Sequence, residues 1–296
     1  MGAAATSPTA RIDWLVSFRV STGPDASQRE PASGSEHAAG LPTSDIVILG
    51  GETLWTNALA NALRRHFGDI PVIIEDKEKT GLFLRRRIRR LGLLAVIGQV
   101  ALGVLARVLR PVIRRRERAI LASKGLDATP LRTDIARVTS ANDPSTTTIL
   151  NELRPKVVVV SQTRILSSRV LAGIPATFIN IHTGMTPQYR GMHGAYWALM
   201  HDDAEHCGVT VHLVDSGIDT GPIIAQARIA PTRSDSYFTY HWAQLATALP
   251  LVIRAVEDAL AGKLSPSPAD AEAKSELFYH PTLWAYLWGG LRRGVW

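Results

Sequence analysis

The sequence has a single cysteine, Cys207, among its 296 residues. It can therefore form neither an intramolecular disulfide nor a cysteine-based zinc site. The first 43 residues also lack a positively charged start followed by an apolar run, so we expect no secretory signal. Residues 1–43 are instead rich in Ala, Ser, Thr, Pro and Gly, and we expect a disordered N-terminal extension there.

Acidic residues are scarce in one stretch of the chain. Arg85 to Arg118 holds eleven arginines and a single acidic residue, Glu117, which gives +10 in that stretch and −3 elsewhere in a chain of formal net charge +7. Proteins that bind nucleic acid carry their positive charge along a whole face. A basic excess confined to one segment therefore argues against a nucleic-acid partner.

Short apolar runs alternate with helical patterns from residue 44 onward. Residues 44–51 are an apolar run that ends in a glycine turn, residues 54–67 have apolar side chains at helical spacing, and residues 70–75 are a second apolar run. This strand–helix–strand order predicts a parallel sheet with right-handed crossovers. We therefore predict an α/β fold, in which a Rossmann-like, mostly parallel twisted sheet carries helices on both faces. Further strands are expected at 157–160, 177–181, 209–214 and 223–229, with helices at 146–153, 192–200 and 237–261, the last interrupted or restarted at Pro250.

Three polar residues stand at the ends of predicted strands. Asn180 and His182 are alternate residues, so an extended strand points both side chains to one face. Asp219 lies in the turn-rich stretch Ser216-Gly-Ile-Asp-Thr-Gly-Pro222. In parallel sheets ligands bind beyond the carboxyl ends of the strands, and an amide, an imidazole and a carboxylate can there stabilise an oxyanion and move a proton. The alternative is a buried histidine bonded to the backbone beside an ordinary turn aspartate.

At these residues the chain resembles the folate-dependent formyltransferases, which carry an Asn-x-His pair and a later aspartate in an Asp-x-Gly turn. The resemblance implies that Asn180, His182 and Asp219 are catalytic and that no metal is needed. It also implies two cofactor-binding segments. The one that in the family wraps the pterin ring through backbone groups is Thr163, Arg164, Ile165 and Leu166, and the one in the loop that closes the pterin pocket is Val214, Asp215, Ser216, Gly217 and Ile218.

The resemblance further implies that a formyl group passes from 10-formyltetrahydrofolate, the co-substrate, to a primary amine. The Asn180 amide and a proton-donating His182 would stabilise the oxyanion, while Asp219 would orient His182 and help take the proton that the nitrogen sheds. Two alternatives remain open. One is a hydrolase that passes the same formyl group to water, and the other is a non-catalytic protein that docks to a membrane or a partner.

The amine acceptor can be predicted only by excluding the acceptors of other family members. Purine-pathway members of the family have a glycine-rich phosphate loop where this chain has Gly50-Gly-Glu-Thr-Leu54, and the acidic Glu52 would repel a phosphate. The tRNA-directed members carry a C-terminal barrel, whereas residues 264–296 are a short aromatic C-terminal tail that we expect to pack on the main domain, to border an acceptor pocket or to form an oligomer contact. We therefore expect a small-molecule or lipid-linked amine, and the sequence does not indicate the oligomeric state.

Residues 77–125 stand where the family has a short connection, and we expect a basic helical insertion there, within a catalytic domain at 44–263. Between Arg90 and Arg107 lie sixteen uncharged residues, three of them glycine. A helix that spans a bilayer needs about 20 apolar residues. Three interpretations stay open: a hydrophobic hairpin packed on the sheet, docking to an anionic membrane surface or a partner through Arg85–Arg118, and a spanning helix. We expect a cytoplasmic protein, peripheral at the inner membrane surface under the second interpretation.

Overall fold

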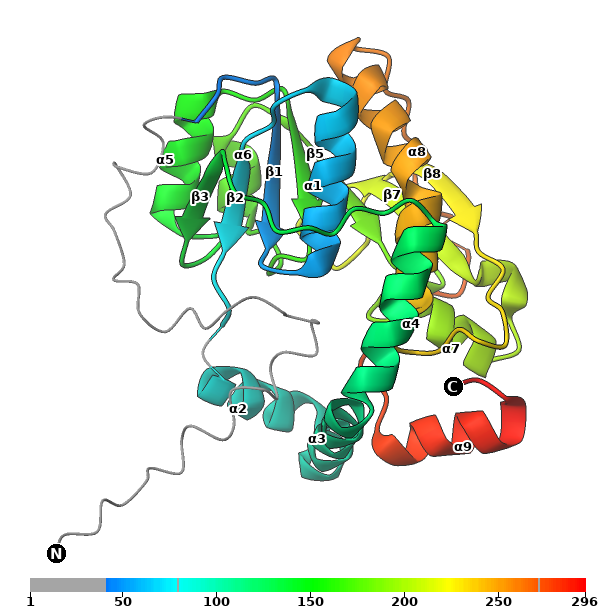
Figure 1. Cartoon of the computed structure of the whole chain (residues 1–296). Helices are drawn as coiled ribbons and strands as arrows, with labels where there is room; N and C mark the ends of the chain where they lie inside the picture. The colour runs from blue at the N-terminus through cyan, green and yellow to red at the C-terminus, as the bar shows by residue number, and fades with distance from the viewer. Residues whose placement is uncertain (1–40, 79, 271) are drawn as a thin grey trace, which may run out of the picture.

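A seven-stranded sheet forms the centre of the part of the chain that the computed structural model describes, which is residues 41–296 except 79 and 271 (Figure 1). The predicted disordered extension lies outside the described residues up to position 40. The strand order is β3-β2-β1-β4-β5-β7-β8. The strands are β1 (Ile46–Gly51), β2 (Val72–Glu75), β3 (Ile135–Val138), β4 (Val157–Ser161), β5 (Thr177–His182), β7 (Gly208–Leu213) and β8 (Ile223–Arg228).

The sheet is parallel from β3 to β5 and antiparallel from β5 to β8. The prediction of a Rossmann-like, mostly parallel sheet is therefore confirmed. The antiparallel strands determine which side chains lie opposite the polar end of β5. Because β7 runs against β5, the side chains of β7 lie directly opposite the polar end of β5, with Asn180 paired to His212.

Helices cover both faces of the sheet, as predicted (Figure 1). In β1, Ile46 and Ile48 pack in one core with α1 (Leu54–Phe67) and α8 (Tyr240–Leu260). Val47 and Leu49 point the other way and pack in a second core with α5 (Pro144–Leu153) and α6 (Ser168–Gly173). This alternation follows from the period of two along an extended strand.

Helix α8 runs without interruption through Pro250, so the predicted break at this residue is wrong. Proline lacks the N–H that would bond to the preceding turn, which normally ends or kinks a helix. Here both halves are anchored in the core. Trp242 and Leu245 before the proline, and Val252 and Val256 after it, are buried in the same cluster. Packing along the whole helix therefore outweighs the loss of one backbone hydrogen bond.

The basic segment folds as α2 (Thr80–Leu91), α3 (Leu93–Val108) and α4 (Arg110–Ser123), rather than as a single hairpin. Gly92, at a φ of 84°, separates α2 from α3. Helix α3 buries Val96 and Leu102, but Leu94 on its other side is 76% exposed. In the described part of the chain no one helix is long and apolar enough to cross a membrane, and α3 with α4 reach that length and composition only together, bent by 74°.

The C-terminal segment packs on the main domain. Its strand β9 (Glu276–Phe278) pairs in parallel with β6 (Tyr189–Gly191), and α9 (Leu283–Arg293) follows. Phe278 stacks on Tyr189, with ring centroids 5.3 Å apart, and on Trp197 of α7 (Gly194–Met200) at 5.4 Å. The aromatic residues of this segment thus fix β6, which leads into the polar site described next.

Candidate active site

The imidazole of His182, at the end of β5, is held between two oxygen atoms. Its Nδ1 lies 3.2 Å from Oδ2 of Asp219, and its Nε2 lies 2.6 Å from the backbone oxygen of Tyr189. An imidazole nitrogen donates to an oxygen acceptor only when it carries a proton, so Nε2 is the nitrogen that can donate to the Tyr189 carbonyl. The ring is 4% exposed. The geometry therefore places a buried imidazole beside a carboxylate.

Asp219 adopts a left-handed backbone conformation, with a φ of 52°. Its Oδ2 also accepts a hydrogen bond of 2.9 Å from the N–H of Gly191, and its Oδ1 lies 3.7 Å from Nε2 of His212. Burial by itself would raise the pKa of the carboxyl group. His182, the nearby His212 ring and the hydrogen bond from Gly191 oppose it, and the pKa of Asp219 falls to about 2. The residue is therefore a permanent anion near neutral pH.

Asn180 and His212 form the second contact at this end of the sheet. Asn180 Nδ2 lies 3.1 Å from His212 Nε2, while His212 Nδ1 lies 2.7 Å from the backbone oxygen of Leu213. With Nδ1 donating to Leu213, Nε2 can accept one N–H of the Asn180 amide, and the other N–H of that amide can donate to a ligand. His212 was not among the site residues predicted from the sequence. Its only signal was an imidazole inside the mostly apolar run Gly208–Leu213.

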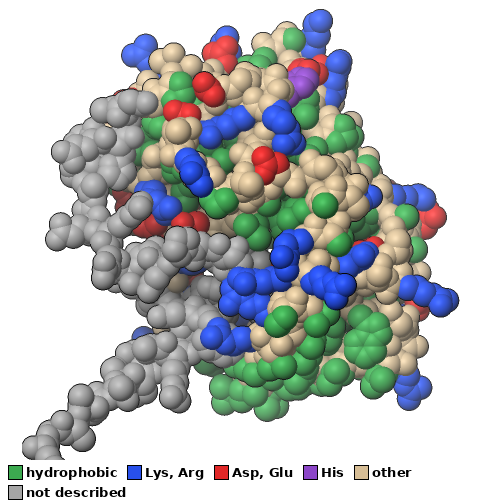
Figure 2. Space-filling model, viewed as in Figure 1, with side chains coloured by type: hydrophobic (Ala, Val, Ile, Leu, Met, Phe, Trp, Pro, Cys, Tyr) green, Lys and Arg blue, Asp and Glu red, His purple; other side chains and the backbone are tan. Residues whose placement is uncertain are grey.

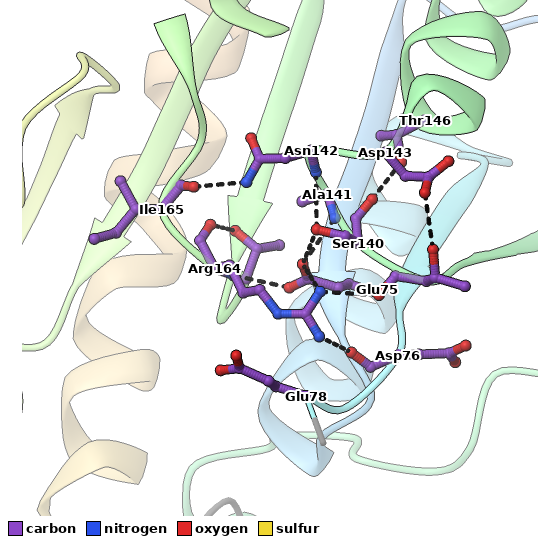
Figure 3. Close-up of polar contacts among 12 residues, drawn as sticks. Glu75, Asp76, Glu78, Ser140, Ala141, Asn142, Asp143, Thr146, Arg164 and Ile165 are labelled. Carbon is purple, nitrogen blue, oxygen red and sulfur yellow. Dashed lines mark hydrogen bonds and ion pairs between the residues drawn. The ribbon is translucent and has the colours of Figure 1, made fainter. Parts of the chain in front are cut away.

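The segment predicted to hold the pterin ring follows β4, next to Asn180, because Val160 and Asn180 pair in the sheet. Figure 3 shows that Arg164 points back toward the end of β2. Its backbone N–H donates to Oε2 of the buried Glu75 at 2.8 Å, and its guanidinium donates to Oε1 at 3.1 Å. Ala141 N–H donates to the same carboxylate at 2.7 Å. Glu75 therefore anchors this segment from the adjoining part of the sheet.

The rest of that segment is fixed at its other end. Leu166 is buried in the core that α5 and α6 complete. Ile165 is exposed, and its carbonyl accepts a 2.9 Å hydrogen bond from the amide of Asn142 (Figure 3). The hydroxyl of Thr163 donates to the carbonyl of Arg164 at 2.9 Å. Of these four residues, Ile165 therefore presents its side chain outward while its neighbours hold the backbone.

The second predicted cofactor segment, Val214 to Ile218, is a loop closed on itself. Asp215 accepts a 3.0 Å hydrogen bond from the N–H of Gly217 and a 2.8 Å bond from the hydroxyl of Thr220. Val214 N–H donates to the carbonyl of Phe178 on β5 at 2.9 Å. The carbonyl of Ile218 accepts from Arg190 on β6 at 3.2 Å, while Ser216 and Gly217 are exposed. These contacts hold Asp219, the next residue, against His182.

The glycine turn after β1 serves the packing of α1. A Cβ at Gly50 would lie 2.5 Å from Cγ2 of Thr56, so only glycine permits this approach of helix and strand. Thr53 caps the helix by accepting the N–H of Thr56 at 3.1 Å. Glu52 pairs with Arg137 of β3 at 2.9 Å. Because this positive charge lies beside it, Glu52 would repel a phosphate less than an unpaired carboxylate would.

Metal-binding side chains are not grouped in the described ranges: no cluster of three or more His, Cys, Asp or Glu residues there could hold a metal ion. Cys207 is buried, and burial raises the pKa of its thiol to about 12. A thiol of that kind stays protonated and unreactive near neutral pH.

Residues 104–248 match the family model described as formyl transferase. The match contains the Asn180, His182 and Asp219 site. It agrees with the resemblance seen in the sequence.

Curated relatives match part of the chain. A methionyl-tRNA formyltransferase of Roseiflexus sp. (strain RS-1) is 38% identical over 130 residues, which is 43% of this chain and 39% of that protein. One from Pelotomaculum thermopropionicum is 33% identical over 116 residues, 39% of this chain and 37% of that protein. The chain thus matches about two fifths of the length of these relatives.

Solved structures with a similar fold include a sugar N-formyltransferase from Shewanella sp FDAARGOS_354, with 14% identity, a TM-score of 0.49, and coverage of 79% of this chain and 76% of that chain. Another is glycinamide ribonucleotide transformylase 1 from Symbiobacterium toebii, with 21% identity, a TM-score of 0.48, and coverage of 76% of this chain and 93% of that chain. These scores are too low to extend any property of those proteins to this chain.

Proposed function

We propose that this chain is an N-formyltransferase that moves the formyl group of 10-formyltetrahydrofolate to a primary amine of a small or lipid-linked acceptor. The observation that carries the proposal is the ion pair of His182 with Asp219 beside the Asn180 amide. Together they place an imidazole, a fixed anion and an N–H donor at the carboxyl end of β5, where α/β sheets bind ligands.

The folate would supply the formyl carbon, which the amine attacks. The developing oxyanion needs donors that are already oriented, since preorganised donors contribute most where charge develops. Asn180 can give one N–H, because its other N–H is directed to His212. His182 would act as the second proton donor. A proton shed by the attacking nitrogen must reach the folate nitrogen as the carbon–nitrogen bond to the formyl group breaks.

Asp219 contributes as an orienting anion rather than as the base. A carboxyl group whose pKa is about 2 holds a proton too weakly to accept one from an amine near neutral pH. It orients the His182 ring, whose Nε2 contacts the Tyr189 carbonyl. This differs from the expectation that Asp219 helps to take the proton.

The residues of the two predicted cofactor segments suit a reduced folate. Ile165 presents an exposed apolar side chain directly after Arg164, the residue that Glu75 anchors. The loop carrying Ser216 and Gly217 is exposed and leads into Asp219. Aromatic ring systems bind where an apolar surface and a few fixed polar groups converge. The segment after β4 and the loop before Asp219 would therefore hold the pterin ring between them.

The first test is ligand binding, followed by an acceptor screen. 5-Formyltetrahydrofolate should raise the unfolding temperature of the folded protein. With a labelled formyl donor, amino sugars, amine-bearing lipids, glycinamide ribonucleotide and methionyl-tRNA should then be compared for gain of one formyl group by mass spectrometry. His182→Ala is the control, and it should retain the fold. No thermal shift at saturating ligand, or full turnover by His182→Ala, would reject the proposal.

A further inference from the structure

Helix α9 leaves one apolar face uncovered. Trp284, Leu287, Trp288 and Leu291 are all exposed, Leu291 at 77%. Their spacing is that of neighbours along one side of an α-helix. The opposite side of the helix, with Tyr286, Gly289 and Gly290, is buried against the domain. An apolar stripe of this kind on a docked helix marks a surface that contacts something else.

Helix α3 presents a second such face beside it. Leu93, Leu94, Ile97, Val104 and Val108 are exposed, whereas Val96, Gly98, Leu102 and Gly103 are buried. The two helices meet at Gly98, where an added Cβ would lie 2.4 Å from the ring of Trp284. Gln99 Nε2 also donates to the carbonyl of His280 at 2.7 Å, just before α9. We call the exposed apolar residues of the two helices, from Leu93 to Val108 and from Trp284 to Leu291, the α3/α9 platform.

Positive charge borders this platform on the side of α4. Figure 2 shows hydrophobic side chains over α3 and α9 at the lower edge of the view, with Lys and Arg side chains above them over α4. A groove of about 480 Å³ on α3 and α4 is lined by Arg107, Arg110, Pro111, Arg114 and Arg118. Residues 80–116 and 277–296 contain no Asp or Glu.

We propose that the α3/α9 platform is a peripheral membrane-binding surface, which rests in the interface of a bilayer rich in anionic lipid. Helices that lie in that interface carry Trp and Leu on the buried side and Arg on the polar side. Tryptophan collects at the level of the lipid headgroups. The arginines of the groove then lie where lipid phosphates can pair with them.

The distribution of charge also favours a membrane over a second copy of the chain as the partner of the platform. A symmetric contact through the platform would bring two arginine-rich surfaces together, with no acidic residue on α2, α3 or α9 to offset them. An anionic membrane instead offers the complementary charge. The buried side of α3 packs on protein through Val96 and Leu102, so the helix contacts lipid with one face only.

The test uses the full chain and vesicles of two compositions. The protein should sediment with vesicles that contain phosphatidylglycerol and much less with pure phosphatidylcholine. Binding should weaken from low to physiological salt, because salt screens exposed charge. Tryptophan emission should shift to shorter wavelength on binding. Protein that stays in the supernatant with phosphatidylglycerol vesicles at low salt would overturn the proposal.

Matched variants separate the apolar and the charged contributions. Leu94→Gln/Leu291→Gln changes two side chains that are more than three-quarters exposed, so the fold should persist. Partitioning should fall on the order of tenfold. Arg110→Gln/Arg118→Gln should reduce binding at low salt by a similar factor. Arg169→Gln/Arg254→Gln removes the same charge from α6 and α8 and should leave binding nearly unchanged.

Two further results would contradict the proposal. Unchanged vesicle binding by Leu94→Gln/Leu291→Gln would show that charge alone carries the interaction. A wild-type dimer in sedimentation that becomes a monomer in this variant, together with no vesicle binding, would assign the platform to self-association. Both readouts are independent of formyl transfer.

Discussion

Nδ1 of His182 lies 3.2 Å from Oδ2 of Asp219, although the aspartate sits in a left-handed turn on a different segment of the chain. Replacing Asp219 by Asn removes the anion and keeps the shape. We expect turnover to fall on the order of a hundredfold or more, because the His182 ring loses the carboxylate that orients it. Steady-state kinetics with the acceptor found in the screen measures this. Unchanged turnover would show that the ion pair is structural.

The same variant should change the response to acid. The pKa of Asp219 is about 2 in the folded protein against an ordinary 3.8. A lowered carboxyl pKa stabilises the fold above pH 4, and this contribution is lost as the pH falls toward 2. This contribution to the free energy of unfolding is about 2 kcal/mol. Denaturant unfolding at pH 7 and in stepwise acid should therefore show a smaller acid loss for Asp219→Asn than for the wild type.

His212 should act by positioning the Asn180 amide, since their side chains lie 3.1 Å apart. His212→Ala should lower kcat by roughly tenfold to a hundredfold, with a smaller effect on the KM for the folate. His212→Asn, which keeps a polar partner, should recover part of the loss. An unchanged kcat in His212→Ala would contradict the positioning role.

Glu75 should control folate affinity through Arg164. Glu75→Gln keeps the volume but removes the charge that binds the Arg164 N–H and guanidinium. We expect weaker binding of 5-formyltetrahydrofolate by roughly tenfold, because the segment after β4 is no longer held in one conformation. Thermal shift titration measures the affinity. Glu257→Gln, which removes an exposed carboxylate on α8, is the control and should bind normally.

Stability should decline in mild acid because of buried histidines. Burial, with smaller effects from the charges of His241 and Arg87, lowers the pKa of His193 to about 3, and burial lowers that of His241 to about 4. Below about pH 6.5 these two histidines bind protons in the unfolded chain, whereas in the folded protein they stay neutral to lower pH. The free energy of unfolding therefore falls as the pH falls.

His193→Asn tests this contribution, since Asn tolerates the left-handed φ of 59° at this position. Tyr237 and His280 face the His193 ring, at 3.1 Å and 2.9 Å. Between pH 7 and pH 5, the free energy of unfolding of the variant should fall by about 1–2 kcal/mol less than that of the wild type. Equal losses measured by chemical denaturation would exclude His193 as the cause.

Local pattern was sufficient for much of the fold. The helix at Leu54–Phe67 begins and ends where apolar spacing and a final glycine predict, and the strands after it follow β-branched runs. The shared orientation of the Asn180 and His182 side chains could also be predicted, because side chains on a strand alternate strictly. These features depend on residues close together in sequence.

Tertiary packing decided the remainder. Asn180 and His212 are 32 residues apart, and Arg164 and Glu75 are 89 apart, so only the strand order brings each pair together. Helix α8 continues through Pro250 because contacts on both sides hold it. The basic segment was recognisable from its composition, but its exposed apolar face became one surface with α9 only when the two helices docked at Gly98. Sequence periodicity records local geometry, whereas contacts between distant segments depend on how the whole chain closes on its core.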